Sequence, residues 1–274
     1  MKEVATISVA EGYLSALYAA GIRYVFVNSG SDFPPIIEAM VRMQQAGKSV
    51  PEFIVAPHEN VALCMAQGYS KISGKASCAM VHVNVGTANT VCAMMNAARD
   101  NVPVLLAAGR TPLTESGHPG SRDRIIHWMQ ENFDQAAIVR ESVKWEYELR
   151  HDQPVGSIVR RAIDIAMQEP RGPVYLTLPR ETLMDDMVEE SSASPATPIG
   201  TASAVPALDA LEKAADLIAN AQMPLIIAGR VCTTARSFEA LAKLAHNAAI
   251  PVTSGAHPNI ASDHPMNLGP VTAK

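Results

Sequence analysis

Glu59 is the acidic residue whose position best suits proton chemistry. It follows the expected strand end 55–58 and opens an expected helix. The apolar residues of this helix recur at steps of four, three and three, at Ala62, Ala66, Tyr69 and Ile72. Counting back three residues from Ala62 places Glu59 on the same buried face. A carboxylate at a helix N-terminus can have no other role than to interact with the helix dipole, which stabilises the helix by about 0.3–1 kcal/mol. On a buried face it is costly unless paired, which favours a functional role in proton transfer.

A second candidate is the stretch 83–89, Val-Asn-Val-Gly-Thr-Ala-Asn, which is expected to join a strand to a helix that ends near Arg99. Gly86 would allow a sharp turn or the close approach of a ligand, and Thr87 or Asn89 could cap the helix. Taken alone, this pattern is typical of an ordinary strand-to-helix turn. The loop at Gly30, Glu59 and this stretch all follow expected strands, and ligands bind at the carboxyl edge of parallel sheets.

Other chemical motifs are excluded by their spacing. Between Gly68 and Gly74 lie five residues where a phosphate-binding loop requires four, and Ala76 replaces the required Ser or Thr. Neither His-Glu-x-x-His nor Gly-x-Ser-x-Gly occurs, and no Gly-x-Gly-x-x-Gly follows a strand. The eight histidines are scattered and the four cysteines form no metal-binding pattern. We therefore predict no metal ligands and expect the cysteines to be buried free thiols.

The elements that must position these residues alternate between strands and helices. Ser8 and Glu11 predict a capping box at the start of the first helix. Apolar strands alternating with helices indicate a parallel sheet covered on both faces. We predict an α/β fold with a doubly wound, mainly parallel six-stranded sheet and helices on both faces, within residues 1–185. The expected strands are 22–27, 53–56, 76–83, 103–108, 143–149 and 173–178.

A change in composition marks the end of this domain. Residues 186–206 are expected to form a linker, because this stretch is rich in Ser, Ala, Thr and Pro and has no apolar period. Residues 207–274 show only two clear strands and two helices, which is a marginal core. We therefore expect a truncated second α/β domain. The length of 274 residues agrees, since it is a little under two domains of about 150 residues.

Composition limits the partners. A hydrophobic fraction of 48% with 18% charged residues is typical of a globular chain, and a net charge of −5 offers no basic surface to nucleic acid. No apolar run approaches the roughly 20 residues of a membrane helix. Glu3 and Glu11 interrupt any signal-peptide core. We expect a cytoplasmic protein with neither nucleic-acid nor membrane partners.

Seven short motifs occur in an order that is specific to one family. Residues 25–31 (V-F-V-N-S-G-S) stand where that family has V-F-G-Y-P-G-G, and residues 58–60 (H-E-N) match its H-E-x block. The other matches are A-Q-G-Y-S-K-I-S-G at 66–74, V-G-T-A-N at 85–89, N-V-P-V-L at 101–105, M-Q-E at 129–131 and G-P-V-Y-L-T-L-P-R at 172–180. This series resembles the N-terminal, pyrimidine-binding domain of thiamine-diphosphate enzymes of the acetolactate synthase group. Residues 206–270 resemble the start of the family's middle domain.

The resemblance implies a role for each candidate residue. Glu59 would hydrogen-bond N1′ of the cofactor's aminopyrimidine, which leads to removal of the thiazolium C2 proton and attack on a 2-oxo acid carbonyl. Gly30, Ser31 and Gln130 would line the reacting centre. Gly86 and Asn89 would border the pyrimidine, and Arg180 would stand near the substrate channel.

Two departures from the family pattern matter. Ser29, Ser31 and Val85 replace Pro, Gly and Pro, and Met129 replaces Phe, so acetolactate formation itself stays open. The family binds the diphosphate and Mg²⁺ through a C-terminal Gly-Asp-Gly motif, which this sequence lacks. We therefore expect a shared thiamine-diphosphate site, with Mg²⁺ held by a missing domain or a partner, and a chain that is inactive without it. FAD is unsupported, because the resemblance leaves its middle-domain site incomplete.

Two classes of function follow. The first is part of a thiamine-diphosphate-dependent carboligase or decarboxylase of small 2-oxo acids, with 2-oxo acid decarboxylase or 2-hydroxyacyl-CoA lyase as the alternatives. It would act as a homodimer or with a chain that carries the diphosphate-binding domain. The second is a non-catalytic fragment or scaffold chain that cannot bind the cofactor alone.

Overall fold

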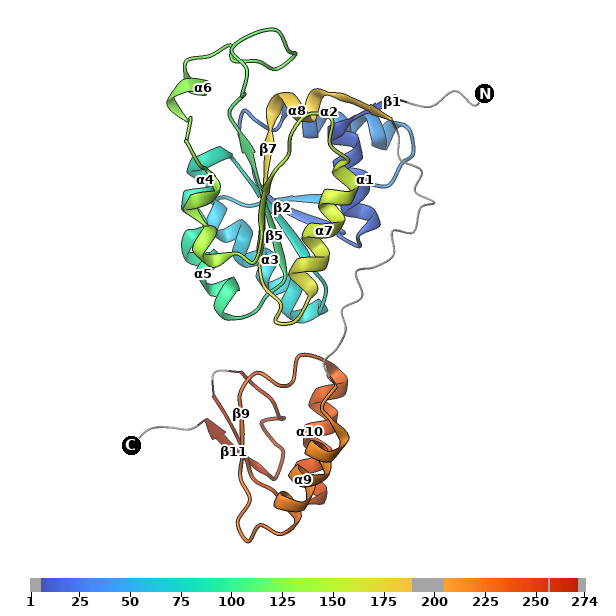
Figure 1. Cartoon of the computed structure of the whole chain (residues 1–274), viewed down its shortest axis with the longest axis vertical. Helices are drawn as coiled ribbons and strands as arrows, with labels where there is room; N and C mark the ends of the chain where they lie inside the picture. The colour runs from blue at the N-terminus through green and yellow to red at the C-terminus, as the bar shows by residue number, and fades with distance from the viewer. Residues whose placement is uncertain (1–5, 189–204, 256, 271–274) are drawn as a thin grey trace. The chain divides into compact units, whose positions relative to one another are not determined.

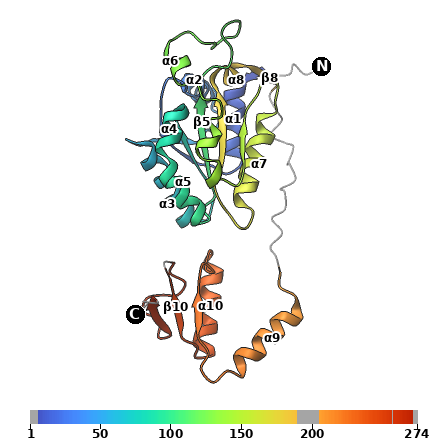
Figure 2. The same ribbon diagram turned by 60° about the vertical axis from the view of Figure 1, so that its left-hand side comes forward.

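The computed structural model describes residues 6–188, 205–255 and 257–270 (Figures 1 and 2). The chain divides into two compact units, Met1–Ala202 and Ser203–Lys274. Of the expected linker 186–206, the first three residues form strand β8 (Asp186–Val188), which pairs antiparallel with β1 (Thr6–Ser8). Most of the remaining linker lies outside the described residues, and the domain boundaries 1–185, 186–206 and 207–274 stay a prediction.

The first unit is built on a six-stranded parallel sheet in the order β3-β2-β4-β5-β7-β6. This confirms the predicted sheet. Strands β4, β5 and β7 are buried almost throughout, as continuous apolar strands covered on both faces must be. The strands are β2 (Tyr24–Asn28), β3 (Glu52–Val55), β4 (Ser77–Val81), β5 (Val104–Arg110), β6 (Glu146–Glu148) and β7 (Val174–Pro179).

Helices cover both faces of this sheet, as predicted (Figure 1). One layer holds α1 (Val9–Ala19), α2 (Pro34–Gln45), α7 (Val155–Met167) and α8 (Arg180–Met184). The other holds α3 (Glu59–Ser73), α4 (Val83–Asn89) and α5 (Val91–Arg99). Short helical turns follow in the loop after β5, namely α6 (Ile126–Met129), η1 (Ala136–Ile138) and η2 (Arg140–Ser142). Each layer packs its own apolar cluster against the sheet.

The capping box that begins α1 is present. The Ser8 hydroxyl accepts a hydrogen bond from the Glu11 amide at 3.2 Å, and the Glu11 carboxylate accepts one from the Ser8 amide at 2.8 Å. Two orphan amides of the first turn are satisfied by this exchange.

The stretch 83–89 differs from the expected turn, because it forms helix α4 directly after β4. The chain reverses at Val83, whose φ is 31°, and the Gly86 amide then donates to the His82 carbonyl at 2.7 Å. Gly86 therefore lies inside a helix and makes no sharp turn. The Thr87 hydroxyl donates to the Val83 carbonyl at 2.7 Å. Neither Thr87 nor Asn89 caps α5, since Thr90 holds its N-cap position.

The second unit is a smaller α/β domain with a three-stranded parallel sheet in the order β11-β10-β9. Its elements are α9 (Leu208–Ala219), β9 (Ile226–Ala228), α10 (Ala235–Asn247), β10 (Val252–Ser254) and β11 (Asn267–Pro270). Strand β11 is a third strand where two were expected. It was not predicted, because its Asn-Leu-Gly-Pro sequence has little strand propensity. The buried core is small and comprises Ala228, Ala245, Val252 and Ile260.

Two further expectations concern single residues and membrane spans. Cys78 is buried and Cys232 is half-buried, but Cys64 and Cys92 are exposed, so the expectation that all four cysteines are buried is wrong for the two exposed ones. Both lie on helices, α3 and α5, whose apolar residues face outward as well as inward. Among the described residues, no helix is long and apolar enough to cross a bilayer.

Candidate active site

Glu59 is the first residue of α3, which follows β3. Its side chain is 12% exposed, so the carboxylate is largely withdrawn from water. The Asn89 side-chain amide donates to Glu59 Oε2 at 3.0 Å. The His58 ring caps the helix instead, with Nδ1 accepting from the Asn60 amide at 3.1 Å. Because His58 satisfies that amide, the Glu59 carboxylate keeps acceptor capacity for another group.

His82 lies at the carboxyl end of β4 and joins three loops. Its Nδ1 lies 2.6 Å from Asp32 Oδ1, and the Gln130 amide nitrogen lies 3.2 Å from its Nε2. The ring also packs directly on Gly30, where a Cβ atom would overlap it. Asp32 is 4% exposed and follows β2, whereas Gln130 follows α6. The sheet therefore gathers Gly30, Gln130 and Asp32 around one imidazole.

The charges around His82 set its protonation. Burial by itself lowers the pKa of His82, but the hydrogen bond to Asp32, the charge of Asp32 and the charge of Glu59 outweigh it. The net effect raises the pKa above the ordinary 6.5. The imidazole therefore holds a proton to higher pH than a free histidine does. A group of this kind can donate a proton to a reacting molecule near neutral pH.

Asn84 supplies an acceptor without a partner. Its Nδ2 donates to Asn132 Oδ1 at 2.6 Å, while its own Oδ1 is buried and has no hydrogen-bond partner within the described part of the chain. An unsatisfied buried acceptor costs about 1–3 kcal/mol. Such an atom on the first turn of α4, two residues after His82, suits a ligand that brings an N–H or O–H group.

The remaining predicted residues are placed as follows. Ser31 is exposed in the loop that holds Gly30 and Asp32. Gly86 is buried in α4, where a Cβ atom would lie 3.0 Å from Val81 Cβ, so it serves helix-to-strand packing. Arg180 begins α8, with Nη1 3.7 Å from Asp123 Oδ1, and it lines a cavity of about 200 Å³ beside α2. The structure thus joins Glu59 to Asn89 and Gly30 to Gln130, and it gives Arg180 other neighbours.

His82 and Asp32 were not singled out from the sequence. The signal was available in the spacing, because both follow strands that are neighbours in the sheet, as does Glu59. Asp32 comes two residues after Gly30, and His82 was counted as part of the expected strand 76–83. The observed β4 ends at Val81, which leaves His82 free to point across the sheet edge.

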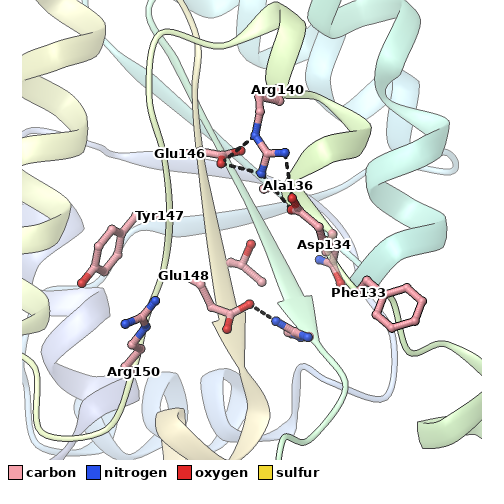
Figure 3. Close-up of a pocket in the computed structure, with 11 residues that line it drawn as sticks. Phe133, Asp134, Ala136, Arg140, Glu146, Tyr147, Glu148 and Arg150 are labelled. Carbon is pink, nitrogen blue, oxygen red and sulfur yellow. Dashed lines mark hydrogen bonds and ion pairs between the residues drawn. The ribbon is translucent and has the colours of Figure 1, made fainter.

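A separate cavity of about 310 Å³ opens beside β5, β6 and β7 (Figure 3). Carboxylates neutralise two of its guanidinium groups. Arg140 pairs with Asp134 and Glu146, each at 2.7 Å, and Arg110 pairs with Glu148. None of the residues predicted from the sequence lines this cavity. Its internal pairing supports a structural role for these charges.

Comparison with known protein families shows which family this chain matches. A protein-family model described as "Thiamine pyrophosphate enzyme, N-terminal TPP binding domain" matches residues 7–138, and the model for the central domain of the same enzymes matches residues 211–273. The chain belongs to the thiamine pyrophosphate enzyme family. This confirms the predicted family, and the description of the N-terminal domain identifies thiamine diphosphate as the cofactor class.

Relatives of this thiamine pyrophosphate enzyme chain include two kinds of catalyst. It is 27% identical over 246 residues to the mitochondrial acetolactate synthase catalytic subunit of Aspergillus candidus, covering 85% of this chain and 33% of the relative. It is also 27% identical over 215 residues to benzoylformate decarboxylase of Pseudomonas aeruginosa, covering 76% and 37%. The chain therefore spans well under half the length of these two relatives.

A solved structure shares the fold. The thiamine diphosphate-dependent 4-hydroxybenzoylformate decarboxylase of Rhodococcus jostii aligns with a TM-score of 0.79 at 23% identity, covering 96% of this chain and 48% of that one. Folds like those of the two units thus both occur in that longer chain.

Proposed function

We propose that this chain supplies the aminopyrimidine half of a thiamine-diphosphate site in an enzyme that acts on small 2-oxo acids. The observation that supports it most is the Glu59 carboxylate, 12% exposed and oriented by the Asn89 amide at 3.0 Å. Bound thiamine diphosphate supplies a nucleophilic carbon for attack on a carbonyl. In this chain, Glu59 holds the proton shared with the pyrimidine ring nitrogen, and Asn89 fixes the carboxylate.

The polar atoms at this edge fit an aminopyrimidine. That ring presents an amino group and, when activated, a ring N–H, so it needs hydrogen-bond acceptors. The Glu59 carboxylate and Asn84 Oδ1, which has no hydrogen-bond partner among the described residues, are two acceptors on helices that follow β3 and β4, the strands on either side of β2. Gly30, Ser31 and Gln130 lie on the loops that meet around His82 and so face the reacting side.

The His82–Asp32 pair favours decarboxylation as the candidate reaction over carboligation. Loss of CO₂ from a 2-oxo acid must be followed by delivery of a proton to carbon, and His82 is a proton donor whose pKa is raised. Asp32 orients the ring through Nδ1, and the Gln130 amide nitrogen lies 3.2 Å from Nε2 on the other side of the ring. Carboligation, 2-hydroxyacyl-CoA cleavage and a non-catalytic scaffold are the competing outcomes of the tests below.

The diphosphate and Mg²⁺ are assigned to residues outside this sequence. Mg²⁺ takes oxygen ligands, mostly carboxylates and phosphates. Within the described ranges, the only group of three His, Cys, Asp or Glu side chains close enough to share an ion contains two histidines and belongs to other loops. We propose that a further domain or a partner chain supplies these ligands, and that the chain is inactive without it. Arg180 is the first residue of α8, and its place near the substrate channel stays a prediction.

The proposed partner of this chain is a second copy of itself, in a homodimer. The outward faces of α3, α4 and α5 carry exposed apolar side chains, at Val61, Met65, Ile72, Val85 and Met95. These three helices lie together in one layer on the same face of the sheet (Figure 2). Pairing this layer with a second copy removes these groups from water.

Replacing Glu59 tests the assignment. In the enzyme completed by the diphosphate-binding part, Glu59→Gln should lower turnover of a 2-oxo acid by about 10²–10⁴-fold, because the amide cannot exchange the proton. It should also slow exchange of the cofactor's C2 proton for deuterium, which NMR measures directly. Glu52→Gln, at an exposed position on β3, is the matched control and should leave both rates unchanged. Unchanged turnover in Glu59→Gln would remove the proposal.

The isolated chain gives a second measurement. Calorimetric titration with thiamine diphosphate and Mg²⁺ should show no tight binding, because the chain contributes only the pyrimidine side. Tight stoichiometric binding by the isolated chain would contradict the shared site. Absence of turnover with every completing domain would favour the scaffold function.

A further inference from the structure

Three side chains that the proposed function does not use converge beside α8. One ring nitrogen of His118, one of His151 and one carboxylate oxygen of Asp185 all lie within 4.8 Å of one another. His151 Nδ1 and Asp185 Oδ2 are in direct contact, and the rings of His118 and His151 lie 5.2 Å apart between centroids at an interplanar angle of 31°. They come from three separate segments of the first unit, so the fold alone brings them together.

The backbone around each residue is fixed. Asp185 is the C-cap of α8, and its carbonyl accepts from the Val9 amide at 2.9 Å. His118 is held in a loop turn, because its amide donates to Ser121 Oγ at 3.1 Å and its carbonyl accepts from the Ser121 amide at 3.1 Å. His151 follows β6, the edge strand of the sheet. Two ligands are therefore anchored to regular structure and the third belongs to a structured loop.

A buried carboxylate strengthens the cluster. The Glu181 side chain is fully buried, and its Oε1 lies 3.9 Å from His151 Nε2. The same Oε1 accepts from the amides of Leu113 and Thr114 at 2.9 and 3.0 Å, which ties the loop after β5 to α8. Glu181 and Asp185 together place two formal negative charges beside two imidazoles. Such a field favours a cation at the point between them.

The ligand set selects the kind of ion. Two imidazole nitrogens and one carboxylate oxygen are typical of Zn²⁺ and neighbouring transition metals, whereas Mg²⁺ and Ca²⁺ prefer oxygen ligands. Tetrahedral Zn²⁺ with bonds of about 2.1 Å spaces its ligand atoms about 3.4 Å apart. The cluster reaches this spacing if the His118 ring moves inward and the His151–Asp185 contact opens to admit the ion. The His118 side chain is exposed, so rotation of its ring toward the other two ligands supplies that movement while its backbone stays in place.

We propose that His118, His151 and Asp185 bind one divalent transition-metal ion, for which Zn²⁺ is the best match, and that the ion fastens the loop 111–125 to the C-terminal end of α8. The ion takes the place of the proton between His151 and Asp185. Water fills the remaining coordination position. The same loop continues into α6 and Gln130, so the ion also steadies the segment that reaches His82.

Zinc titration of untagged protein tests this site. The titration uses a Cys64→Ser/Cys92→Ser background, because those two exposed thiols could bind zinc themselves. Calorimetry should give one Zn²⁺ per chain. His118→Ala and Asp185→Asn should each weaken binding by at least about tenfold. His246→Ala removes an exposed histidine that packs edge-to-face against His264 and belongs to no group of three potential ligands within the described residues, so it should leave the affinity unchanged.

Two further measurements separate a loss of zinc binding from a loss of folding in the variants. His118 is exposed and Asp185→Asn preserves the backbone hydrogen bond to Val9, so both variants should fold, which circular dichroism checks. Zn²⁺ should also raise the melting temperature of the parent and slow hydrogen exchange in the loop 111–125, and it should do neither in His118→Ala. Equal binding by parent and His118→Ala, or no binding at millimolar zinc, overturns the proposal.

Discussion

At the level of single residues, two glycines make room for the Asp32–His82 pair. A Cβ atom at Gly30 would overlap the His82 ring, and one at Gly109 would overlap the Asp32 carboxylate. Neither glycine has a positive φ, so space and not backbone conformation requires them. Asp32 Oδ2 also accepts from the Val83 amide at 3.3 Å. The pair is thus enclosed by β5, the loop after β2 and the start of α4.

The Asp32–His82 pair makes stability depend on pH. The folded-state pKa of His82 is raised above 6.5, so the stabilisation it brings is complete below the unfolded pKa and is lost as the pH rises through the folded pKa. Asp32→Asn removes the main cause of the shift. NMR titration should therefore show a lower pKa for His82 in the variant than in the parent. The stability deficit of the variant, measured by urea unfolding, should shrink as the pH rises through the folded pKa of the parent.

An unchanged His82 pKa in Asp32→Asn would show that Asp32 does not control the imidazole.

At the level of elements, the contribution of the Ser8 cap of α1 to the stability of the protein can be measured directly. Ser8→Ala removes the hydroxyl that accepts from the Glu11 amide, and it should destabilise the protein by about 0.5–2 kcal/mol. Ser15→Ala changes the same residue type at an exposed position inside α1, where alanine is the better helix former, and should be neutral or slightly stabilising. Equal losses in the two variants, measured by chemical denaturation, would contradict a capping role for Ser8.

Elements with strong local signals were predictable and those set by tertiary contacts were not. The local sequence is enough to predict the capping box at Ser8 and the buried strands β4, β5 and β7, which are apolar runs. Helix α4 was missed because its Val-Asn-Val-Gly-Thr-Ala-Asn sequence has weak helix propensity. It is held by packing of Gly86 on Val81 and by the Thr87 hydroxyl, which also lies 2.8 Å from the buried Tyr175 hydroxyl. Such partners are remote in sequence.

At the level of the whole molecule, topology explains which site residues the sequence could predict. Glu59, Gly30 and the stretch 83–89 follow β3, β2 and β4, which are neighbours in the sheet, so the rule for carboxyl edges brings them to one place. Which side chains pair with one another at this edge depends on their length and direction, and the pattern of strands does not predict either. His82 was passed over for that reason. Arg180 follows β7, two strands away from β4, and its observed ion-pair partner is Asp123.

The proposed homodimer is the property of the whole molecule that one substitution can test. Met65 is 37% exposed on the outward face of α3, in the layer that also exposes Val85 and Met95. A glutamate there would bring two like charges into an apolar interface, so Met65→Glu should shift the chain toward monomer in analytical ultracentrifugation, with the dimer dissociation constant rising at least about tenfold. Ile37→Glu, at a 44% exposed position on α2 in the opposite layer, should leave the constant unchanged. A monomeric parent chain, or equal effects of the two variants, would rule out this layer as the interface.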